Sequence, residues 1–334
     1  LKSGDSNDPL NYRIVSLINQ FSKIFERIAF KRLNDFLEMN NFFSKNQFGF
    51  RKGISTAHCI LSIINSISKS LNDNQLVLCV LLDIAKCFDS VNHSILLAKL
   101  NRYGIRGLAN DWFRSYFSNR KQRVYVNGTP SDILCSICLG ILQGSILGVI
   151  LFTIFINDIG RACRELIAKL FADDCTGLIS AKNLTELIPL ANQELDRLLN
   201  WYNANKLLIN AKKTKALLFG PPRTNLDLEK TSSGHTIFPV FLNFNSPGES
   251  NITKIVNLNL IPNPDETSAK LLGVLIDSKL NLKSHMKFVH SKVARANYTL
   301  AQMRNILDQR HLLLLYNSYL RSNMEYCCLL FVLA

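Results

Sequence analysis

The chain has 334 residues, of which 47% are hydrophobic, and it carries a formal net charge of +14. This length and composition exclude a disordered tail and predict one large multilobed domain or two to three small ones. The basic excess favours an anionic partner, and we expect nucleic acid rather than a membrane surface. The apolar run at 146–156 is shorter than the roughly 18 to 20 residues of a membrane helix, so it predicts a buried core segment and no membrane partner.

Apolar positions at helical spacing predict a long amphipathic helix from Asn19 to Asn40. A basic stripe on another face of this helix fits either a solvated surface or phosphate contact, and consists of Lys23, Arg27 and Lys31. A basic glycine loop at 51–56 then leads into a predicted helix at 55–71. Arg51 and the start of that helix both favour anions, so the loop is suited to phosphates.

The segment 75–83 is aliphatic without alternation, which predicts a strand buried on both faces. It ends in Asp83, and a charge at the end of a buried strand marks a cleft. Two helices follow, one at 90–100 with Ser90 or Asn92 as its cap and one around 107–123. The basic and aromatic residues interleaved in the second suit a surface that meets nucleic acid, but aromatic residues at helical spacing are expected mainly in the core.

The remaining elements alternate between strands, helices and loops in chain order. They are a strand and turn at 124–128, a buried helix after the loop 139–145, a hairpin at 168–180, a helix at about 184–205, a basic loop and strand at 206–220, an irregular segment at 221–268, a hairpin at 269–283, and helices at about 284–306 and 309–323.

The nine cysteines are scattered, and no second close pair or His cluster accompanies them at zinc-finger spacing. We predict reduced, buried thiols. The polar first segment lacks Met, so it predicts neither a signal peptide nor a transit peptide, and it is typical of an internal part of a longer reading frame.

Two adjacent carboxylates, Asp173 and Asp174, lie between the apolar stretches "KLFA" and "TGLIS". Like charges at the edge of a core repel and raise one pKa, and a divalent cation relieves that repulsion. Asp83 joins them if the two β elements lie side by side. Mg²⁺ prefers carboxylates together with substrate phosphates, and two such ions serve phosphoryl transfer. This pattern alone fits a polymerase or a metal-dependent nuclease.

The sequence motifs around these carboxylates distinguish a polymerase from a nuclease. In this order, five segments closely resemble the palm motifs of reverse transcriptases of non-LTR (LINE-type, jockey-like) retrotransposons: "LLDIAKCFDSVNHSILLAKL", "GILQGSILGVILFTIFINDI", "FADDCTGLI", "LLINAKKTKALLF" and "KLLGVLID". The segment from Asn11 to His58 is similar to the finger region of the same family. The resemblance covers about residues 1–325 and leaves the nuclease alternative without support.

The resemblance implies the roles of individual residues. Asp83, Asp173 and Asp174 match the catalytic triad, which holds two Mg²⁺ ions, with Mn²⁺ as an alternative; Asp83 and Asp173 are expected to bridge both ions. The other matches are the steric gate Phe88, the nucleotide and template pocket at Gln143 and Gly144, the triphosphate contact Arg51, the pyrophosphate proton donor Lys213 (or, one register away, Lys212 or Lys215), and the primer grip at Leu272 and Gly273. An ordinary core Phe is the alternative for Phe88.

The resemblance also implies an α+β right-hand polymerase, with an antiparallel palm sheet backed by helices. Its expected parts are fingers at 1–75, a palm at 76–220, an irregular insertion at 221–268, a primer-grip hairpin at 269–283 and a partial thumb at 284–334. The implied partners are an RNA template, a DNA primer and deoxynucleoside triphosphates, and the implied location is the nucleus.

The chain departs from the family pattern where three prolines are replaced, by Ile14, Leu142 and Val149. Each replacement removes a fixed backbone φ angle. Without the prolines at Leu142 and Val149, we expect a shift of the loop that holds Gln143. Position 87, commonly alanine, is Cys87. Two functions therefore compete: an active RNA-directed DNA polymerase, and a decayed or domesticated copy that binds RNA without polymerising. The three retained carboxylates favour the enzyme.

Overall fold

A five-stranded sheet forms the centre of the computed structural model, which describes residues 5, 12, 15–126, 128–210, 213–221, 240–245, 253–257, 259–261 and 268–332. The strands lie in the order β13 (Asn259–Ile261), β10 (Lys215–Phe219), β1 (Leu76–Leu82), β8 (Asp174–Ala181) and β7 (Ile167–Phe171). All neighbours are antiparallel except β10 and β13, which are parallel. The predicted α+β pattern of an antiparallel sheet with helices is present.

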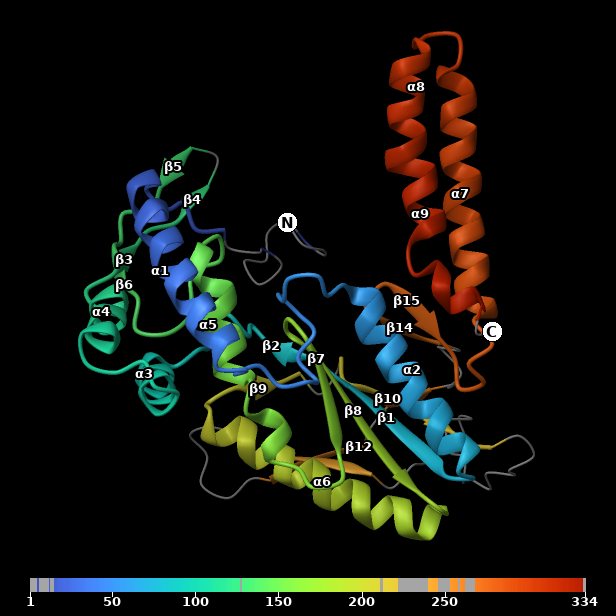
Figure 1. The fold of residues 1–334 in the computed structure, drawn as a ribbon, viewed down its shortest axis with the longest axis horizontal. Helices are drawn as coiled ribbons and strands as arrows, with labels where there is room; N and C mark the ends of the chain where they lie inside the picture. The colour runs from blue at the N-terminus through green and yellow to red at the C-terminus, as the bar shows by residue number, and fades with distance from the viewer. Residues whose placement is uncertain are drawn as a thin grey trace.

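Helices cover both faces of this sheet, and Figure 1 shows α2 (Thr56–Asn72) and α6 (Leu184–Ala204) on opposite sides of it. Val77 and Cys79 of β1 join the apolar cluster that contains α2, whereas Leu78 and Val80 join the cluster that contains α6. Apolar and polar residues do not alternate along β1 because the side chains on both of its faces are buried. The predicted two-sided burial of this strand is confirmed.

Four helices pack beside one end of the sheet (Figure 1). They are α1 (Gln20–Met39), α3 (His93–Arg102), α4 (Leu108–Phe117) and α5 (Ile146–Ile156). The side chain of Asn92 accepts a hydrogen bond from the Ile95 amide, so Asn92 is the cap of α3. Helix α4 ends at Phe117, earlier than predicted; Phe113 and Phe117 are buried, whereas Trp112 is exposed.

The orientation of α1 differs from the expectation drawn from its apolar spacing. Four apolar side chains in its first half are exposed: Phe21, Ile24, Phe25 and Ile28. Its core contacts come from Leu33 and Leu37, and Glu26 is only 1% exposed. The charged side chain is buried because it accepts hydrogen bonds from α4 and from the start of α5, as described below.

Three pairs of two-residue strands lie outside the central sheet among the described residues. They are β2 (Ile84–Ala85) paired with β9 (Leu208–Ile209), β3 (Lys121–Gln122) paired with β6 (Cys135–Ser136), and β4 (Tyr125–Val126) paired with β5 (Thr129–Pro130). The last pair agrees with the strand and turn predicted at 124–128.

The range predicted to be irregular, 221–268, contains regular structure. Strands β11 (Phe241–Asn245) and β12 (Thr253–Asn257) form a hairpin, and β13 joins the central sheet beside β10. The expectation of an irregular insertion is wrong for these three ranges, because residue composition does not reveal strand pairing, either within the range (β11 with β12) or with an earlier strand (β13 with β10).

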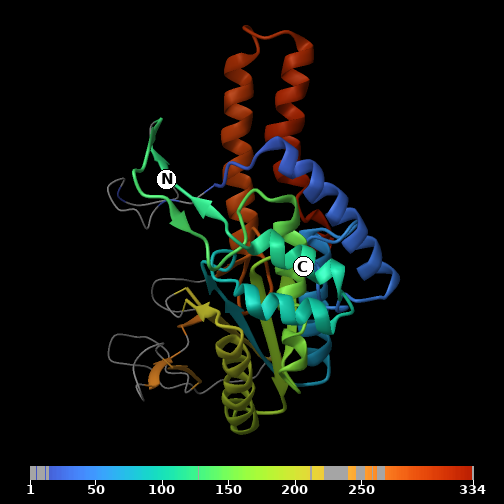
Figure 2. The same ribbon diagram turned by 90° about the vertical axis from the view of Figure 1, so that its left-hand side faces the viewer.

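The C-terminal part begins with the predicted hairpin, formed by β14 (Ala269–Leu271) and β15 (Val274–Ile276). Helix α7 (Lys283–Met303) follows, and α8 (Gln309–Leu315) returns beside it through a π-helical turn into α9 (Ser322–Glu325). Figures 1 and 2 both show α7 and α8 as a pair that projects away from the sheet. The two predicted helices are confirmed.

The cysteines correct one further expectation. All nine are free, but Cys135, Cys138 and Cys328 are exposed rather than buried. The first two belong to or follow β6, a two-residue strand at the periphery, which gives them no core to enter. No helix among the described residues has the length and apolar character needed to cross a membrane.

Candidate active site

Strand pairing brings the three candidate carboxylates to one end of the sheet. The β1–β8 register pairs Leu82 with Cys175, so the next residues outward are Asp83 and Asp174. Asp173 lies in the two-residue turn between β7 and β8, whose last pair is Phe171 with Asp174. The sequence therefore predicted the juxtaposition correctly.

The carboxylates interact electrostatically. The pKa of Asp174 is raised from its ordinary 3.8 to about 6, first because surrounding protein removes hydration and then because Asp173 and Asp83 add negative charge. The thiol of Cys87 donates to Asp173 Oδ2 at 3.6 Å. Burial and the Asp173 charge raise the pKa of Cys87 to about 12, so its proton stays in place as a weak donor.

Three carboxylates that repel one another are a suitable donor set for a hard divalent cation, which would relieve the repulsion that raises the pKa of Asp174. Among the described residues, no three His, Cys, Asp or Glu side chains are arranged closely enough to hold an ion together. The oxygen donors and their mutual repulsion suit Mg²⁺ chemically, whereas the spacing of the three side chains in this structure does not form an ion site.

Phe88 and Gln143 belong to two segments that are tied together. The Phe88 carbonyl accepts from the Ile141 amide at 2.7 Å, and Gln143 Nε2 donates to Asp89 Oδ1 at 3.1 Å. The Phe88 ring stacks on the Phe152 ring, with the two ring centroids 4.6 Å apart, and this contact fixes the orientation of Phe88. The structure thus places the predicted gate and the predicted pocket glutamine beside each other.

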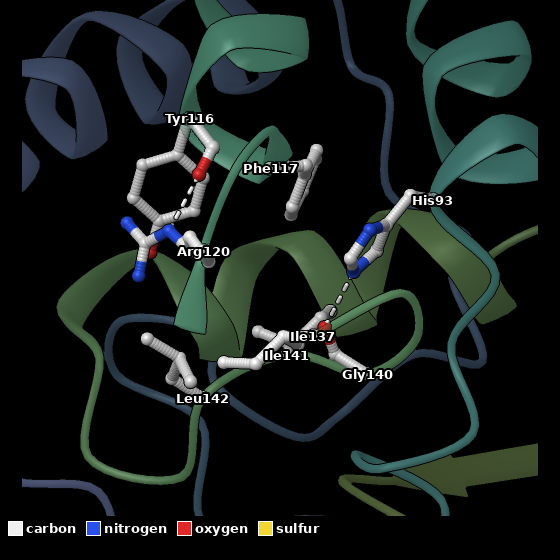
Figure 3. Close-up of a pocket in the computed structure, with 8 residues that line it drawn as sticks. All are labelled: His93, Tyr116, Phe117, Arg120, Ile137, Gly140, Ile141 and Leu142. Carbon is white, nitrogen blue, oxygen red and sulfur yellow. Dashed lines mark hydrogen bonds between the residues drawn. The ribbon is translucent and has the colours of Figure 1, made fainter. Parts of the chain in front are cut away.

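The loop before Gln143 is held by its surroundings (Figure 3). His93 Nε2 donates to the Gly140 carbonyl at 2.8 Å, and the His93 ring stacks on Phe117. A Cβ on Gly140 would lie 2.8 Å from the Asp89 carbonyl oxygen, so the two segments touch through backbone. Gly144 adopts φ 113°, a left-handed conformation that favours glycine.

Glu26 fixes the other end of the same loop, and sequence reasoning missed it. Its carboxylate accepts from the Tyr116 hydroxyl at 2.8 Å, the Ser145 hydroxyl at 2.9 Å and the Ile146 amide at 2.7 Å. A negative charge at the N-terminus of α5 is favourable. The available signal was the helical spacing that puts Glu26 on the same face as Leu33 and Leu37.

Lys213 lies on the turn that follows β9, and this turn is attached to the first carboxylate. The Asn210 amide donates to the Asp83 carbonyl at 2.8 Å, and the Lys213 amide donates to the Asn210 carbonyl at 3.1 Å. Lys213 is exposed. Lys212, one of the register alternatives for Lys213, lies outside the described residues. Ile14, which replaces a proline of the family pattern, also lies outside them.

Arg51 and the hairpin turn at Leu272 and Gly273 have other partners. Arg51 lies 3.8 Å from Glu38 and 5.5 Å from the centre of the Phe43 ring, and its buried Nε has no hydrogen-bond partner among the described residues.

The Leu272 carbonyl accepts from the Tyr326 hydroxyl, which lies 3.1 Å from the Thr56 hydroxyl. Both turn residues have positive φ, as a type I′ hairpin turn requires. Within the described part of the chain, neither Arg51 nor this turn forms a hydrogen bond or ion pair with the three aspartates.

An antiparallel sheet with three aspartates at one end, a glycine loop bonded to the Phe88–Asp89 segment after the first of them, and a basic turn attached to that aspartate define a carboxylate-centred site of the nucleotidyl-transfer class. The family model described as reverse transcriptase (RNA-dependent DNA polymerase) matches residues 2–276. This match spans most of the chain, and the chain belongs to the reverse transcriptase family.

Curated relatives carry the same description. The chain is 26% identical to a probable RNA-directed DNA polymerase from transposon BS of Drosophila melanogaster, over 90% of this chain and 31% of the relative. It is 25% identical to the corresponding protein of transposon X-element, over 98% and 34%, and 26% identical to that of the mobile element jockey, over 87% and 30%. The chain spans about a third of the length of these relatives.

Solved structures of telomerase from Candida tropicalis are also similar. One, in complex with a fragment of telomeric RNA, has 12% identity and a TM-score of 0.42, over 66% of this chain and 36% of that chain. A second, of the apo telomerase, has 12% identity and the same TM-score, over 65% of this chain and 39% of that chain.

Proposed function

We propose that the chain is the RNA-directed DNA polymerase domain of a non-LTR retrotransposon polyprotein, which extends a DNA primer along an RNA template with deoxynucleoside triphosphates. The observation that carries the proposal is the β1–β8 register, which aligns Asp83 with the turn that holds Asp173 and Asp174. Reverse transcriptases generally use divalent metals, and family membership supports the reaction class.

Within this proposal the fold is a right hand. The fingers would be residues 1–75, the palm 76–220 with β10 and β13 at its edge, and the partial thumb 284–334. The hairpin at 269–283 would grip the primer through Leu272 and Gly273. Its attachment to both Thr56 and Tyr326 supports a fixed position between the start of α2 and the C-terminal helices.

Asp83, Asp173 and Asp174 would hold the divalent ions, Mg²⁺ or alternatively Mn²⁺. Bound ions would supply Lewis acidity at the primer 3′-hydroxyl and would neutralise charge on the leaving pyrophosphate. The protein's contribution is to keep three carboxylates together at a sheet end, with Asp174 losing its proton only above about pH 6.

Phe88, Gln143 and Gly144 would select and position the nucleotide. The Phe88 ring is fixed against Phe152, so it can exclude a 2′-hydroxyl by contact and select deoxynucleotides. Gln143 is oriented by Asp89, and the left-handed backbone at Gly144 allows close approach to a ligand.

Two basic residues would serve the triphosphate. The Arg51 side chain is 25% exposed and lies 3.8 Å from Glu38, so this long pairing leaves guanidinium N–H groups other than the buried Nε available to phosphate oxygens. Lys213 is exposed on a turn hydrogen-bonded to the Asp83 backbone, where its ammonium group could protonate the leaving pyrophosphate.

The net charge of +14 supports binding of the template and primer backbones. Action in the nucleus, where a chromosomal primer is available, is part of the proposal. A tagged chain found only outside the nucleus during element mobilisation would count against this part.

The test is incorporation of dTTP on a poly(rA)–oligo(dT) template-primer with Mg²⁺ or Mn²⁺. Wild-type protein should extend the primer, Asp173→Asn should not, and the control Asp132→Asn, at an exposed aspartate remote from the sheet end, should retain activity.

The second candidate, a decayed copy that binds RNA without polymerising, is favoured by Leu142 and Val149, which flank the nucleotide loop in place of proline. No extension by folded protein that still binds the duplex at low salt would support it and reject polymerase activity.

A further inference from the structure

A short segment before Arg51 pairs with the edge of the central sheet. The Leu170 amide donates to the Asn46 carbonyl at 2.9 Å, and the Phe48 amide donates to the Leu170 carbonyl at 2.8 Å. A parallel bridge joins Gln47 to Leu170. Residues 46–49 therefore extend the sheet beside β7, close to the turn that carries the catalytic pair.

Gly49 lies against that turn more closely than any other residue type would permit. A Cβ at this position would fall 2.1 Å from the Ala172 backbone nitrogen and 2.9 Å from the Phe171 carbonyl carbon. These are backbone atoms, so no side-chain rotation relieves the overlap. Gly49 does not have a left-handed φ, and therefore the space, rather than the conformation, requires glycine here.

The turn beneath Gly49 is itself under strain. Ala172 adopts φ 57°, a conformation that costs a non-glycine residue roughly 1 kcal/mol or more. Asp173 and Asp174 follow it directly. A strained turn keeps its shape only where its neighbours hold it, and Gly49 and Leu170 are joined by an amide-to-carbonyl hydrogen bond of 3.3 Å.

The segment is anchored on its other side as well. Gln47 is 1% exposed, and its Nε2 donates to the Gly49 carbonyl at 3.2 Å. Lys169, on β7, donates to the Asn46 side chain at 3.0 Å and to the Ser62 hydroxyl of α2 at 2.9 Å. Gly49 is therefore held in place by side-chain contacts as well as by the sheet pairing.

We propose that Gly49 is a positioning residue for catalysis, which sets the location of Asp173 and Asp174 by seating residues 46–49 directly on the Ala172 backbone. The inference rests on the proposed function for its catalytic consequence.

Gly49→Ala tests this inference, with Gly160→Ala as the matched control. Gly160 has nothing within 4 Å of an added Cβ and no left-handed φ, so the control makes the same chemical change without a clash. We expect Gly49→Ala to weaken binding of Mn²⁺ alone, measured by calorimetry, by about tenfold. We expect primer extension to fall by about 100-fold, with a raised Mg²⁺ requirement, because a displacement of about 1 Å has that effect.

The thermal midpoint and the KM for dTTP separate positioning from general damage. Positioning predicts a lower kcat and weaker metal binding, with a KM close to that of wild type. Unchanged Mn²⁺ affinity and Mg²⁺ dependence in folded Gly49→Ala would overturn the inference while leaving the proposed function intact. Inactive wild type, with Mn²⁺ binding still weakened by Gly49→Ala and not by Gly160→Ala, would support the inference and reject the polymerase.

Hydrogen exchange of the wild type provides a readout if Gly49→Ala does not fold. The Phe48 and Leu170 amides should be protected at least about 100-fold more than the amide of Gly160, which is an exposed residue. Exchange of both amides as fast as that of Gly160 would show that the segment does not sit on the sheet, and would overturn the inference.

Discussion

Replacing Asp174 with asparagine should stabilise the metal-free protein at neutral pH, although it removes a proposed metal ligand. The raised pKa of about 6 means that the folded state resists ionisation of this group. A shift of this size corresponds to roughly 3 kcal/mol at 1.36 kcal/mol per pKa unit. Residue 174 is exposed, so water and salt screen much of this, and we expect about 1 kcal/mol.

The pH dependence of this stability gain follows from the raised pKa of Asp174. Below the ordinary value of 3.8 the carboxyl is protonated in both the folded and the unfolded state, and its raised pKa has no effect on stability. As the pH rises from 3.8 through about 6, the unfolded state ionises before the folded state does, so the free energy of unfolding falls. The advantage of Asp174→Asn should therefore be small near pH 4 and complete near pH 7.5. Added Mg²⁺ should stabilise the wild type more than the variant.

Urea denaturation in EDTA at the two pH values measures this effect, with Asp132→Asn as the control for loss of a surface charge. The reasoning is refuted if Asp174→Asn is no more stable than wild type near pH 7.5, or if its advantage is the same at both pH values. A similar gain in Asp132→Asn would attribute the effect to net charge rather than to the carboxylate cluster.

Three further changes test other parts of the site. Phe88→Val should reduce the preference for dTTP over UTP, measured as a ratio of kcat/KM, by about 10- to 100-fold, because the fixed ring no longer excludes the 2′-hydroxyl; an unchanged ratio would identify an ordinary core residue. Glu26→Ala should lower the free energy of unfolding by about 2 to 4 kcal/mol and Glu26→Gln by less, because the alanine removes the acceptor of three buried or partly buried donors; equal urea midpoints for alanine and wild type would contradict the contacts. Affinity for an RNA–DNA duplex should fall with salt, with a log–log slope of about −3 or steeper, and a slope near zero would exclude an extended phosphate-binding groove.

The sheet and its carboxylates were predictable because their signals are local or repeated. An unbroken aliphatic run identified β1 and its buried faces, and the two apolar half-strands around Asp173 predicted the hairpin. The ordered motifs then linked Asp83 to that hairpin. The structure agrees, because the antiparallel β1–β8 register leaves little freedom in where the strand ends meet.

The parts that were missed depend on long-range contacts. Helical spacing showed that α1 has an apolar side, but not that Glu26 would be buried and Phe25 exposed, because this depends on hydrogen bonds to α4 and α5. The pairing of β13 with β10 crosses a sequence separation that composition cannot read. Gly49 lies within the segment that resembles the finger region, yet its contact with Ala172 depends on the fold, which brings together residues 123 positions apart.

The central claim is that the carboxylates at this sheet end carry out templated nucleotide addition. Single-nucleotide extension of a DNA primer on four RNA templates, differing only in the first unpaired base, tests it most directly. The account predicts that wild type adds only the complementary deoxynucleotide in each case, and that Asp83→Asn and Asp173→Asn add none while remaining folded. Addition that ignores the template base, or that survives in both variants, would contradict it.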